Sequence, residues 1–381
     1  MIGVTGTNGK TTTSFMVRHV LAAEGKQPGL IGTVRYEIGS RSIPAIRTTP
    51  EAPDIQFMLD QMVRSGCRSA VLEVSSHALQ QQRVRGTDFD VGVFTNLTRD
   101  HLDYHGSMEE YFAAKSQLFL ELGQHHKQAA AVVNLDDEWG HALVRMNGLK
   151  ARIITYGENP SAHVCAEDVK LGANGTSFIV QTPWGSTPVH LHLLGRFNVS
   201  NALAAIAACG ALGISPERSA AALGEMRVVP GRLERFVSPR GFNVFVDYAH
   251  TDDALKHALE TLRELNPNRL ITVFGCGGDR DRGKRARMGA VAAANADVTV
   301  LTSDNPRREK PEAIIAEIEQ GMTGRGRYEI VVDREKAIAR AIEMAQEGDI
   351  VLIAGKGHEN TQEFASTVVP FDDREVARRY L

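Results

Sequence analysis

The stretch GVTGTNGKTTT, residues 3–13, joins a short apolar run at residues 2–5 to a helical pattern at residues 11–24. Backbone amides at a strand-to-helix junction of this kind can hold phosphate groups. Lys10 is placed to reach the β- and γ-phosphates of a nucleotide, and the Thr11 hydroxyl is placed to bind Mg²⁺. Valine stands where the strict GxxxxGK[ST] pattern has its first glycine. The pattern alone therefore favours nucleotide binding and leaves a plain glycine turn as the alternative.

Apolar runs typical of strands alternate with helical patterns along most of the chain. This alternation is typical of βαβ units around mostly parallel sheets. It predicts an α/β fold with a mononucleotide-binding part first and a Rossmann-like, doubly wound part second. The first part continues with residues 29–33, 53–64 and 70–74, and the second part consists of residues 243–247, 253–265, 270–274, 298–301, 311–320, 329–332, 335–345 and 350–353.

Within the first part, a strand-rich interval at residues 168–194 follows the alternating segments. Turn signals at Asn174-Gly175 and Trp184-Gly185 lie between alternating segments, which predicts antiparallel strands. After two further helical patterns, Val229-Pro230-Gly231 breaks the alternation. We therefore predict two domains, residues 1–229 and 230–381, which agrees with the length of 381 residues. The two helical patterns are residues 199–212 and 216–226.

The composition excludes several classes of protein. Lys and Arg total 43 against 46 Asp and Glu, so the net charge of −3 offers no basic excess for nucleic acid or an anionic membrane surface. No apolar run reaches the roughly 18 residues of a membrane span, and the N-terminus lacks the basic and apolar segments of a secretory signal. Four widely spaced cysteines without a CxxC pair fit reduced thiols. We expect a cytoplasmic protein without membrane insertion or a nucleic-acid partner.

Further motifs are EVSSHAL at residues 73–79, NLTRDHLDYHG at 96–106, DNPR at 304–307 and GKGHE at 355–359. Together with TGTNGKTTT, they resemble the motifs of the Mur ligase family and most closely those of its MurE branch. They run from Gly3 to the C-terminus in the order that the family shows. The resemblance implies an ATP-dependent, Mg²⁺-requiring amide ligase of peptidoglycan precursor synthesis, with a central ATPase domain and a C-terminal domain for the incoming amino acid. It implies UDP-MurNAc-L-Ala-D-Glu and meso-diaminopimelate as substrates, an acyl-phosphate intermediate and a monomer.

The resemblance leaves two alternatives. Family members carry one further N-terminal domain of about 100 residues that holds the uridine end of the substrate, whereas this chain begins at the phosphate loop. A nucleotide-binding module without ligase activity, acting as a partner or regulator, is therefore one alternative. Intact Lys115, Arg307 and Glu359 disfavour it. A folylpolyglutamate-type ligase is the other, which the DNPR and GKGHE motifs disfavour.

The resemblance assigns nucleotide binding to the phosphate loop and to three later residues. It places Asn198 at adenine, Arg232 at phosphate and Asp247 at ribose. For Asn198, an N-cap of the following helix is the alternative. The loop residues are Gly6, Thr7, Asn8, Gly9, Lys10, Thr11 and Thr12.

Phosphoryl transfer depends on positioning and on cations near the transferring oxygens. Glu73 ends the apolar run at residues 70–72, where a carboxylate at the edge of a parallel sheet faces the ligand crevice; a solvated strand end is the alternative. The resemblance makes His101 a Mg²⁺ ligand. The predicted catalytic residues are Lys10, Glu73, His101 and Lys115, and the predicted metal ligands are Thr11, Glu73, His101 and Lys115.

Lys115 can be argued from its helix. Ser107 and Glu110 form a capping-box pattern, and Lys115 interrupts the apolar stripe of the helix that follows. Its amine either extends to the surface or is held where desolvation lowers its pKa and favours the neutral form, which reacts with CO₂. In the Mur ligases the matching lysine is carbamylated, so the resemblance implies the same for Lys115.

The resemblance also identifies substrate contacts. meso-Diaminopimelate has a distal carboxylate that lysine lacks, and the guanidinium of Arg307 can pair with it through two hydrogen bonds. The other residues implied for the amino acid are Arg280, Asp304, Asn305, Gly355 and Glu359. Those implied for the nucleotide-linked peptide are Thr48, Thr49, Ser75, Gln81 and Arg83.

Overall fold

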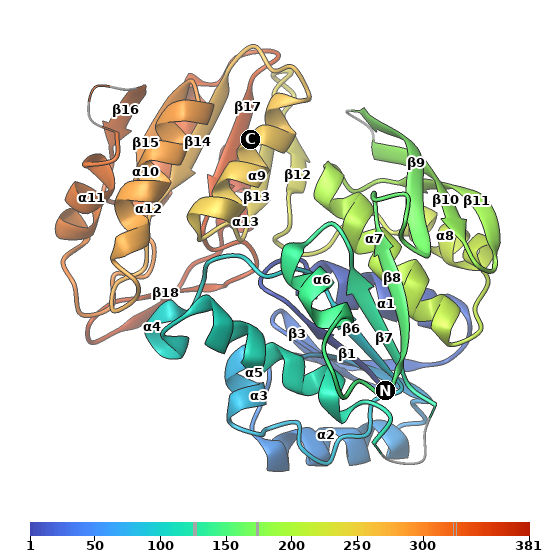
Figure 1. Cartoon of the computed structure of the whole chain (residues 1–381). Helices are drawn as coiled ribbons and strands as arrows, with labels where there is room; N and C mark the ends of the chain where they lie inside the picture. The colour runs from blue at the N-terminus through green and yellow to red at the C-terminus, as the bar shows by residue number, and fades with distance from the viewer. Residues whose placement is uncertain (125–127, 173–174, 323, 325) are drawn as a thin grey trace. The chain divides into compact units, whose positions relative to one another are not determined.

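The computed structural model describes residues 1–124, 128–172, 175–322, 324 and 326–381, which form two compact units, Met1–Arg227 and Val228–Leu381. The sequence placed the boundary after residue 229. Both units are α/β, as predicted (Figure 1). In the described part of the chain, no helix is both long enough and apolar enough to cross a membrane. The four cysteines are free thiols, three of them buried.

The first unit is built on a mixed sheet whose centre is parallel. Its described strands lie side by side in the order β11 (Gly185–Leu191), β10 (Gly175–Thr182), β9 (Val164–Gly172), β8 (Arg152–Gly157), β7 (Ala130–Asn134), β6 (Val91–Phe94), β1 (Ile2–Thr5), β5 (Ser69–Glu73), β2 (Pro28–Ile31), β3 (Arg35–Ile38) and β4 (Arg41–Pro44). The run from β9 to β2 is parallel, because each neighbouring pair in it has the same direction. The segments at the two edges are antiparallel.

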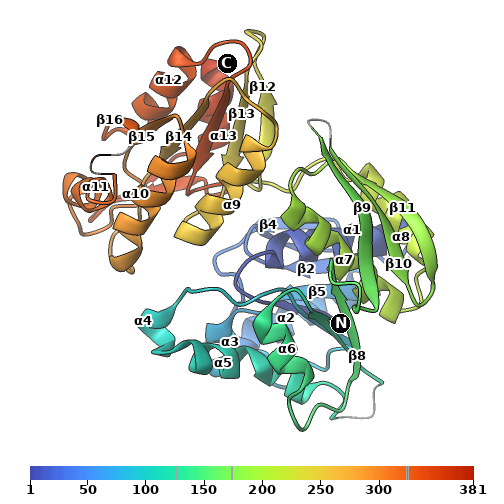
Figure 2. The same ribbon diagram turned by 45° about the horizontal axis from the view of Figure 1, so that its top comes forward.

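The antiparallel strands predicted around residues 168–194 are confirmed. β10 pairs antiparallel with β9 and with β11, and Thr182 lies opposite Gly185 where the second pair turns. The first strand begins at Val164, earlier than predicted, and Asn174 of the other turn lies outside the described residues. The sequence did not predict that β9 joins the parallel sheet through β8. Figure 2 shows these strands beside α7 (Arg196–Ala211) and α8 (Pro216–Glu225).

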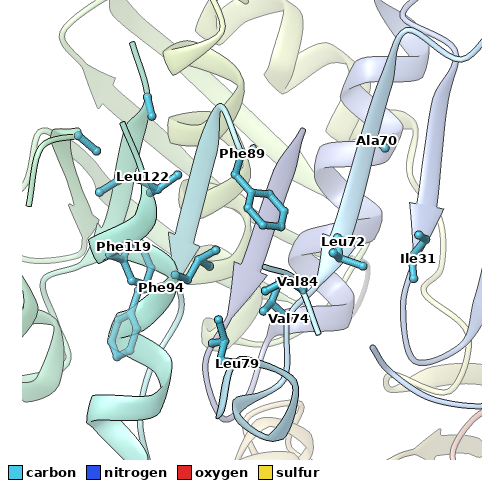
Figure 3. Packing of buried hydrophobic residues seen from close by; sticks show 14 of the residues in the cluster. Ile31, Ala70, Leu72, Val74, Leu79, Val84, Phe89, Phe94, Phe119 and Leu122 are labelled. Atoms are coloured by element: carbon cyan, nitrogen blue, oxygen red, sulfur yellow. The ribbon is translucent and has the colours of Figure 1, made fainter. Parts of the chain in front are cut away.

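Helices cover both faces of the first sheet. In β5, Ala70 and Leu72 belong to a buried cluster that also includes Phe119, whereas Val71, between them, is buried outside it. The cluster includes residues of both α2 (Ala52–Arg64) and α5 (Met108–Glu121). Figure 3 shows Phe94 beside Phe119 of α5. Their rings lie edge to face, with centres 6.2 Å apart. Burial on both faces is what a parallel sheet requires. The helices of this unit are α1 (Lys10–Ala23), α2 (Ala52–Arg64), α3 (Ser76–Gln80), α4 (Leu102–His105), α5 (Met108–Glu121), α6 (Glu138–Val144), α7 (Arg196–Ala211) and α8 (Pro216–Glu225).

The second unit has a sheet in the order β12 (Glu234–Val237), β13 (Asn243–Asp247), β17 (Ile350–Ala354), β14 (Leu270–Phe274), β15 (Val298–Leu301) and β16 (Arg327–Ile330). Only β12 is antiparallel to its neighbour among the described strands of this sheet. α12 (Arg334–Met344) and α13 (Asp373–Tyr380) pack on one face through Ile338, Ile342 and Val376. The remaining elements are α9 (Asp252–Arg263), α10 (Gly283–Asn295), α11 (Pro311–Glu319), α12 (Arg334–Met344), α13 (Asp373–Tyr380) and the hairpin of β18 (Thr361–Glu363) and β19 (Val368–Pro370).

Candidate active site

The phosphate loop connects β1 to α1, and two of its glycines adopt backbone conformations that other residues rarely adopt. Gly6 has φ +143° and Gly9, the N-cap of α1, has φ +83°. A Cβ atom on Gly6 would lie 1.9 Å from Thr95 Oγ1, and one on Gly9 would lie 2.5 Å from Asn201 Oδ1. Glycine is therefore required at both positions for the loop to pack this closely.

The loop is fastened to the segment that follows β6. The amides of Thr7 and Asn8 donate to the backbone oxygen and the side-chain oxygen of Asn96, both at 2.9 Å. Thr95 Oγ1 donates to the Asn8 carbonyl at 2.6 Å. These two loop amides therefore hold the loop in shape, and α1 begins immediately beyond them at Lys10.

Two lysines converge on one carbonyl of this loop. Lys10 Nζ donates to the carbonyls of Gly6 (2.8 Å) and Thr7 (2.7 Å), and Lys115 Nζ donates to the same Gly6 carbonyl at 2.8 Å. The Lys115 side chain from α5 is buried, so the alternative that it extends to the surface is wrong. Burial, followed by the nearby positive charge of Lys10, holds the pKa of Lys115 well below its usual range. Two adjacent amines of this kind favour an anion between or beside them.

Glu73 lies at the carboxyl end of β5 and is fully buried, so the alternative of a solvated strand end is wrong. Its Oε2 accepts from the hydroxyls of Thr11 (3.0 Å) and Thr33 (2.8 Å), and its Oε1 accepts from the Thr33 amide at 2.9 Å. Thr33 Oγ1 also lies 3.1 Å from Thr48 Oγ1. A Cβ atom on Gly32 would come within 2.3 Å of Glu73 Oε1. Thr33 ends the apolar run at residues 29–33, and nothing in the sequence pattern indicated its contact with Glu73.

The donors around Glu73 fit a hard cation such as Mg²⁺. The Thr11 hydroxyl and the Glu73 carboxylate are both oxygen donors, and they lie 3.0 Å apart. Within the part of the chain that the structure describes, no three His, Cys, Asp or Glu side chains gather as a metal site. The suitability of this site for Mg²⁺ therefore rests on this oxygen pair, on His101 and on the chemistry of Lys115.

His101 is linked to Lys115 through Tyr111 of α5. The rings of His101 and Tyr111 are 6.2 Å apart, and Lys115 Nζ lies 4.6 Å from the centre of the Tyr111 ring. The Tyr111 hydroxyl is 3.2 Å from Thr7 Oγ1 in the phosphate loop. Partial burial lowers the pKa of His101 to about 4, although Asp100 opposes this, so its ring is neutral at pH 7 and can bind a metal. The predicted catalytic residues of this unit thus surround the loop.

More aromatic side chains surround His101 than the sequence analysis identified. His77 of α3 lies 4.9 Å from the His101 ring and 4.1 Å from the Tyr104 ring. His105 stacks on Tyr111 at 5.0 Å, and its Nε2 is 2.9 Å from Ser76 Oγ. Apart from Tyr111, these residues belong to the motifs at residues 73–79 and 96–106, but only the fold shows that they touch.

The residues predicted to bind the nucleotide-linked peptide also lie near Glu73. Thr49 Oγ1 donates to the Glu73 carbonyl at 2.8 Å and accepts from the Ser75 amide at 3.0 Å. Ser75 caps α3, and Arg83 donates to the Thr49 carbonyl at 3.0 Å and to the side chain of Gln81. The structure thus brings these residues together from three separate segments.

Asn198 lies inside the first turn of α7, whose N-cap is Gly195. The alternative that Asn198 caps this helix is therefore wrong. Its Nδ2 donates to the Leu194 carbonyl at 2.7 Å, and its Oδ1 accepts from Asn201 at 3.0 Å. Asn201 in turn accepts from Thr13 of α1 at 3.3 Å, which connects Asn198 to the helix that follows the phosphate loop.

In the second unit, Asp247 ends β13 beside Arg232. The Leu233 amide donates to Asp247 Oδ2 at 2.7 Å. Burial raises the pKa of the Asp247 carboxyl, and the charge of Arg232 opposes this rise. The Arg232 guanidinium lies over the Tyr248 ring at 4.7 Å.

Two loops, at the carboxyl ends of β15 and β17, carry most of the remaining predicted residues, whereas Arg280 lies on the segment that follows β14. Gly355 has φ +117°, and a Cβ atom there would lie 2.6 Å from Asp304 Oδ2, so the loops meet at this point. Buried Arg334 donates to the carbonyls of Ser303 (3.3 Å) and Ala354 (3.0 Å), where the two loops begin. Its charge is balanced by buried Asp373, at 2.7 Å. No sequence signal pointed to this arginine.

Asn305, Lys356 and Glu359 form a closed group of hydrogen bonds. Lys356 Nζ, fully buried, donates to Asn305 Oδ1 and to Glu359 Oε2, and Asn305 Nδ2 donates to the same Glu359 oxygen, each at 3.0 Å. This arrangement fixes the orientation of both predicted substrate residues. Lys356 lies inside the GKGHE motif, yet the sequence analysis did not select it.

Arg307 and Arg280 flank Gly277. A Cβ atom on Gly277 would lie 3.1 Å from Arg307 Nη1 and 3.8 Å from Arg280 Cγ. Arg280 is exposed, and its Nη1 lies 3.4 Å from the Asp279 carbonyl. Arg307 donates from Nε to Glu363 at 2.8 Å and from Nη1 to the Gly278 carbonyl at 2.9 Å. In the second unit, most residues of the predicted amino-acid site therefore lie at the carboxyl ends of the parallel strands.

Comparison with known proteins gives the family. Residues 4–209 match the Mur ligase middle domain, and residues 231–357 match the Mur ligase glutamate ligase domain. The UDP-N-acetylmuramoyl-L-alanyl-D-glutamate–2,6-diaminopimelate ligase of Geobacillus kaustophilus is 50% identical over 99% of this chain and 78% of its own length. The ligase of the same name from Synechococcus elongatus is 47% identical over 99% of this chain and 76% of its own length.

Solved structures of proteins similar to this chain agree with the family found by sequence comparison. A UDP-N-acetylmuramoyl-L-alanyl-D-glutamate–2,6-diaminopimelate ligase is 39% identical, with a TM-score of 0.69 over 100% of this chain and 77% of that one. The folylpolyglutamate synthase of Mycobacterium tuberculosis is 20% identical with a TM-score of 0.73 over 94% of this chain and 88% of that one, which shows a shared fold. By sequence, by domain order and by structure, this chain belongs to the Mur ligase family.

Proposed function

We propose that this chain is an ATP-dependent ligase that joins the D-glutamate γ-carboxylate of UDP-MurNAc-L-Ala-D-Glu to an amine of meso-diaminopimelate, releasing ADP and phosphate. The reaction belongs to peptidoglycan precursor synthesis. The relatives that carry this activity in their names support it, as do the two family domains. The observation that carries the proposal is the convergence of Lys10 and Lys115 on the Gly6 carbonyl beside the Thr11–Glu73 pair.

A carboxylate is a poor electrophile, so the amine needs an activated acyl group. Transfer of the γ-phosphoryl group to the substrate carboxylate gives an acyl phosphate, from which the amine then displaces phosphate. Lys10 places its positive charge where the β- and γ-phosphates are held, in place of its present bonds to loop carbonyls. Such fixed charge stabilises the transition state because it needs no reorganisation during the reaction.

Thr11, Glu73, His101 and carbamylated Lys115 are the residues that would hold Mg²⁺. When bound, Mg²⁺ neutralises charge that develops on the phosphoryl oxygens. Lys115 suits carbamylation because burial favours its neutral amine, which is the form that reacts with CO₂. The neutral amine would add CO₂ and release one proton, which gives an anionic oxygen ligand that attracts the Lys10 cation.

The remaining residues divide between nucleotide and substrates. We assign Asn198 to adenine, Arg232 to phosphate and Asp247 to ribose. Residues 1–229 then act as the ATP-binding domain and residues 230–381 as the domain for the incoming amino acid. Arg307 pairs with the distal carboxylate of diaminopimelate. The other amino-acid contacts are Arg280, Asp304, Asn305, Gly355 and Glu359, and the contacts to the nucleotide-linked peptide are Thr48, Thr49, Ser75, Gln81 and Arg83.

The test is a ligase assay on the purified chain with ATP, Mg²⁺, the UDP-linked dipeptide and meso-diaminopimelate. We expect ADP release and a product whose mass equals that of both substrates less one water. ADP release should require both acceptor and donor substrates. A chain that binds ATP but forms no product under any substrate concentration would support the alternative of a nucleotide-binding module.

We expect Lys115 to carry a carbamate in solution. Protein equilibrated with ¹³C-bicarbonate should show a carbamate carbon signal that Lys115→Ala lacks and that the exposed-lysine control Lys150→Ala keeps. Activity of Lys115→Ala should rise by about tenfold with a short-chain carboxylate such as propionate, because the acid can supply the missing oxygen ligand. Identical carbamate signals in wild type and Lys115→Ala, with no such rescue, would refute the assignment.

A further inference from the structure

Glu363 ends β18 and contacts the Arg307 loop through both its side chain and its backbone. Its Oε2 accepts from Arg307 Nε at 2.8 Å, and its carbonyl accepts from the Arg307 amide at 3.0 Å. Its own amide donates to Asn305 Oδ1 at 3.0 Å. One residue of the hairpin therefore contacts two members of the proposed amino-acid site.

The two bonds of the Arg307 side chain determine which of its nitrogens remain for a ligand. A guanidinium has five N–H donors, one on Nε and two on each terminal nitrogen. Glu363 takes the Nε donor, and the Gly278 carbonyl takes one Nη1 donor at 2.9 Å. The N–H donors that the described contacts of Arg307 do not use, and that can therefore bind a ligand, are all on Nη1 and Nη2. A carboxylate can still bind there with two hydrogen bonds, but it cannot bind through the Nε edge while Glu363 holds it.

The backbone of Arg307 also needs support. It has φ +49°, in the left-handed region that a residue with a side chain rarely adopts, and it forms an isolated parallel bridge with Phe364. The bridge and the Arg307 amide bond depend on the hairpin backbone, not on the Glu363 side chain. That side chain is 45% exposed, so its removal creates no buried cavity. The role of the carboxylate can therefore be tested without disturbing the loop.

We propose that Glu363 is a specificity-determining positioning residue, whose carboxylate holds the Arg307 guanidinium so that its Nη1–Nη2 edge receives the distal carboxylate of the acceptor amino acid. This rests on the proposed function. Without the bond to Nε, the long arginine side chain samples other rotamers, and binding must order it again. L-Lysine has no distal carboxylate, so its use does not depend on how Arg307 is held.

The experiment measures steady-state kinetics of wild type, Glu363→Ala and Glu363→Gln with meso-diaminopimelate and with L-lysine. For Glu363→Ala we expect KM for diaminopimelate to rise by about tenfold, with kcat within about twofold and lysine kinetics unchanged. Glu363→Gln should stay within about threefold of the wild-type KM, because its amide oxygen still accepts from Nε. An unchanged or lower KM in Glu363→Ala would overturn the proposal, since Glu363 would then be a bystander or a competitor for Arg307.

Glu329→Ala is the matched control. Glu329 pairs with Arg340 at 2.9 Å, its side chain is 42% exposed, and it lies in the same unit. This variant should leave the KM for diaminopimelate unchanged. Wild type that does not prefer diaminopimelate over lysine would overturn the proposed function and this inference with it. If the wild type prefers diaminopimelate over lysine and Glu363→Ala keeps the wild-type KM for diaminopimelate, only this inference is overturned.

Discussion

Lys10→Ala should lower kcat for ATP-dependent ligation by roughly 1000-fold or more, because the proposed function assigns the lysine charge to the transferring phosphates. The structure gives this charge a defined position. Lys10 Nζ lies within 2.8 Å of the Gly6 carbonyl and within 2.7 Å of the Thr7 carbonyl, at the start of α1. We do not expect Lys115, on the same carbonyl, to replace it, because burial lowers the pKa of Lys115 and the proposed carbamylation would make its side chain anionic.

The measurement combines turnover with calorimetry of ATP binding. Lys150→Ala, which removes an exposed lysine, is the control for a change in net charge and should behave as wild type. Because Lys10 also bonds to two loop carbonyls, the melting temperature of the variant should be recorded to separate lost chemistry from a loosened loop. Normal ATP affinity together with normal turnover in a folded variant would overturn the phosphate-loop assignment.

Arg307→Ala should lower kcat/KM for meso-diaminopimelate by on the order of 10- to 1000-fold. A charge-assisted pair with two hydrogen bonds contributes roughly 1.5–3 kcal/mol, and its loss leaves the substrate carboxylate without a partner. Discrimination against L-lysine should shrink. Lysine need not become a good substrate, because Asn305 and Glu359 remain held by Lys356 around the distal amino-acid centre.

The decisive quantity is the ratio of kcat/KM for the two amino acids in wild type and variant. Arg340→Ala is the matched control, since Arg340 is also paired with a glutamate and is 44% exposed. It should leave the ratio unchanged. If Arg307→Ala leaves the ratio unchanged as well, then Arg307 does not bind the distal carboxylate and the assignment of diaminopimelate loses its structural support.

The local sequence pattern predicted strands well where the residues of the strand itself are enough to identify it. The strands Ile2–Thr5, Asn243–Asp247, Leu270–Phe274 and Val298–Leu301 have the predicted bounds, because each is a short apolar run that both faces of a parallel sheet bury. The Ser107 cap, whose side chain accepts from the Glu110 amide, is also as predicted. α10 was not predicted, because it starts with a glycine and several basic residues that mask its apolar face.

The sequence by itself determined the two α/β parts, the phosphate loop and the identity of the residues around it, because these depend on the order of residues along the chain. Only the tertiary structure decided between the alternatives for single side chains. The helix pattern could not tell whether Lys115 is exposed; it is buried because the Gly6 carbonyl, 109 residues away in sequence, receives its amine. Likewise, Glu363 holds Arg307 across 56 residues. Contacts of this range depend on how strands are ordered in a sheet, which no local pattern contains.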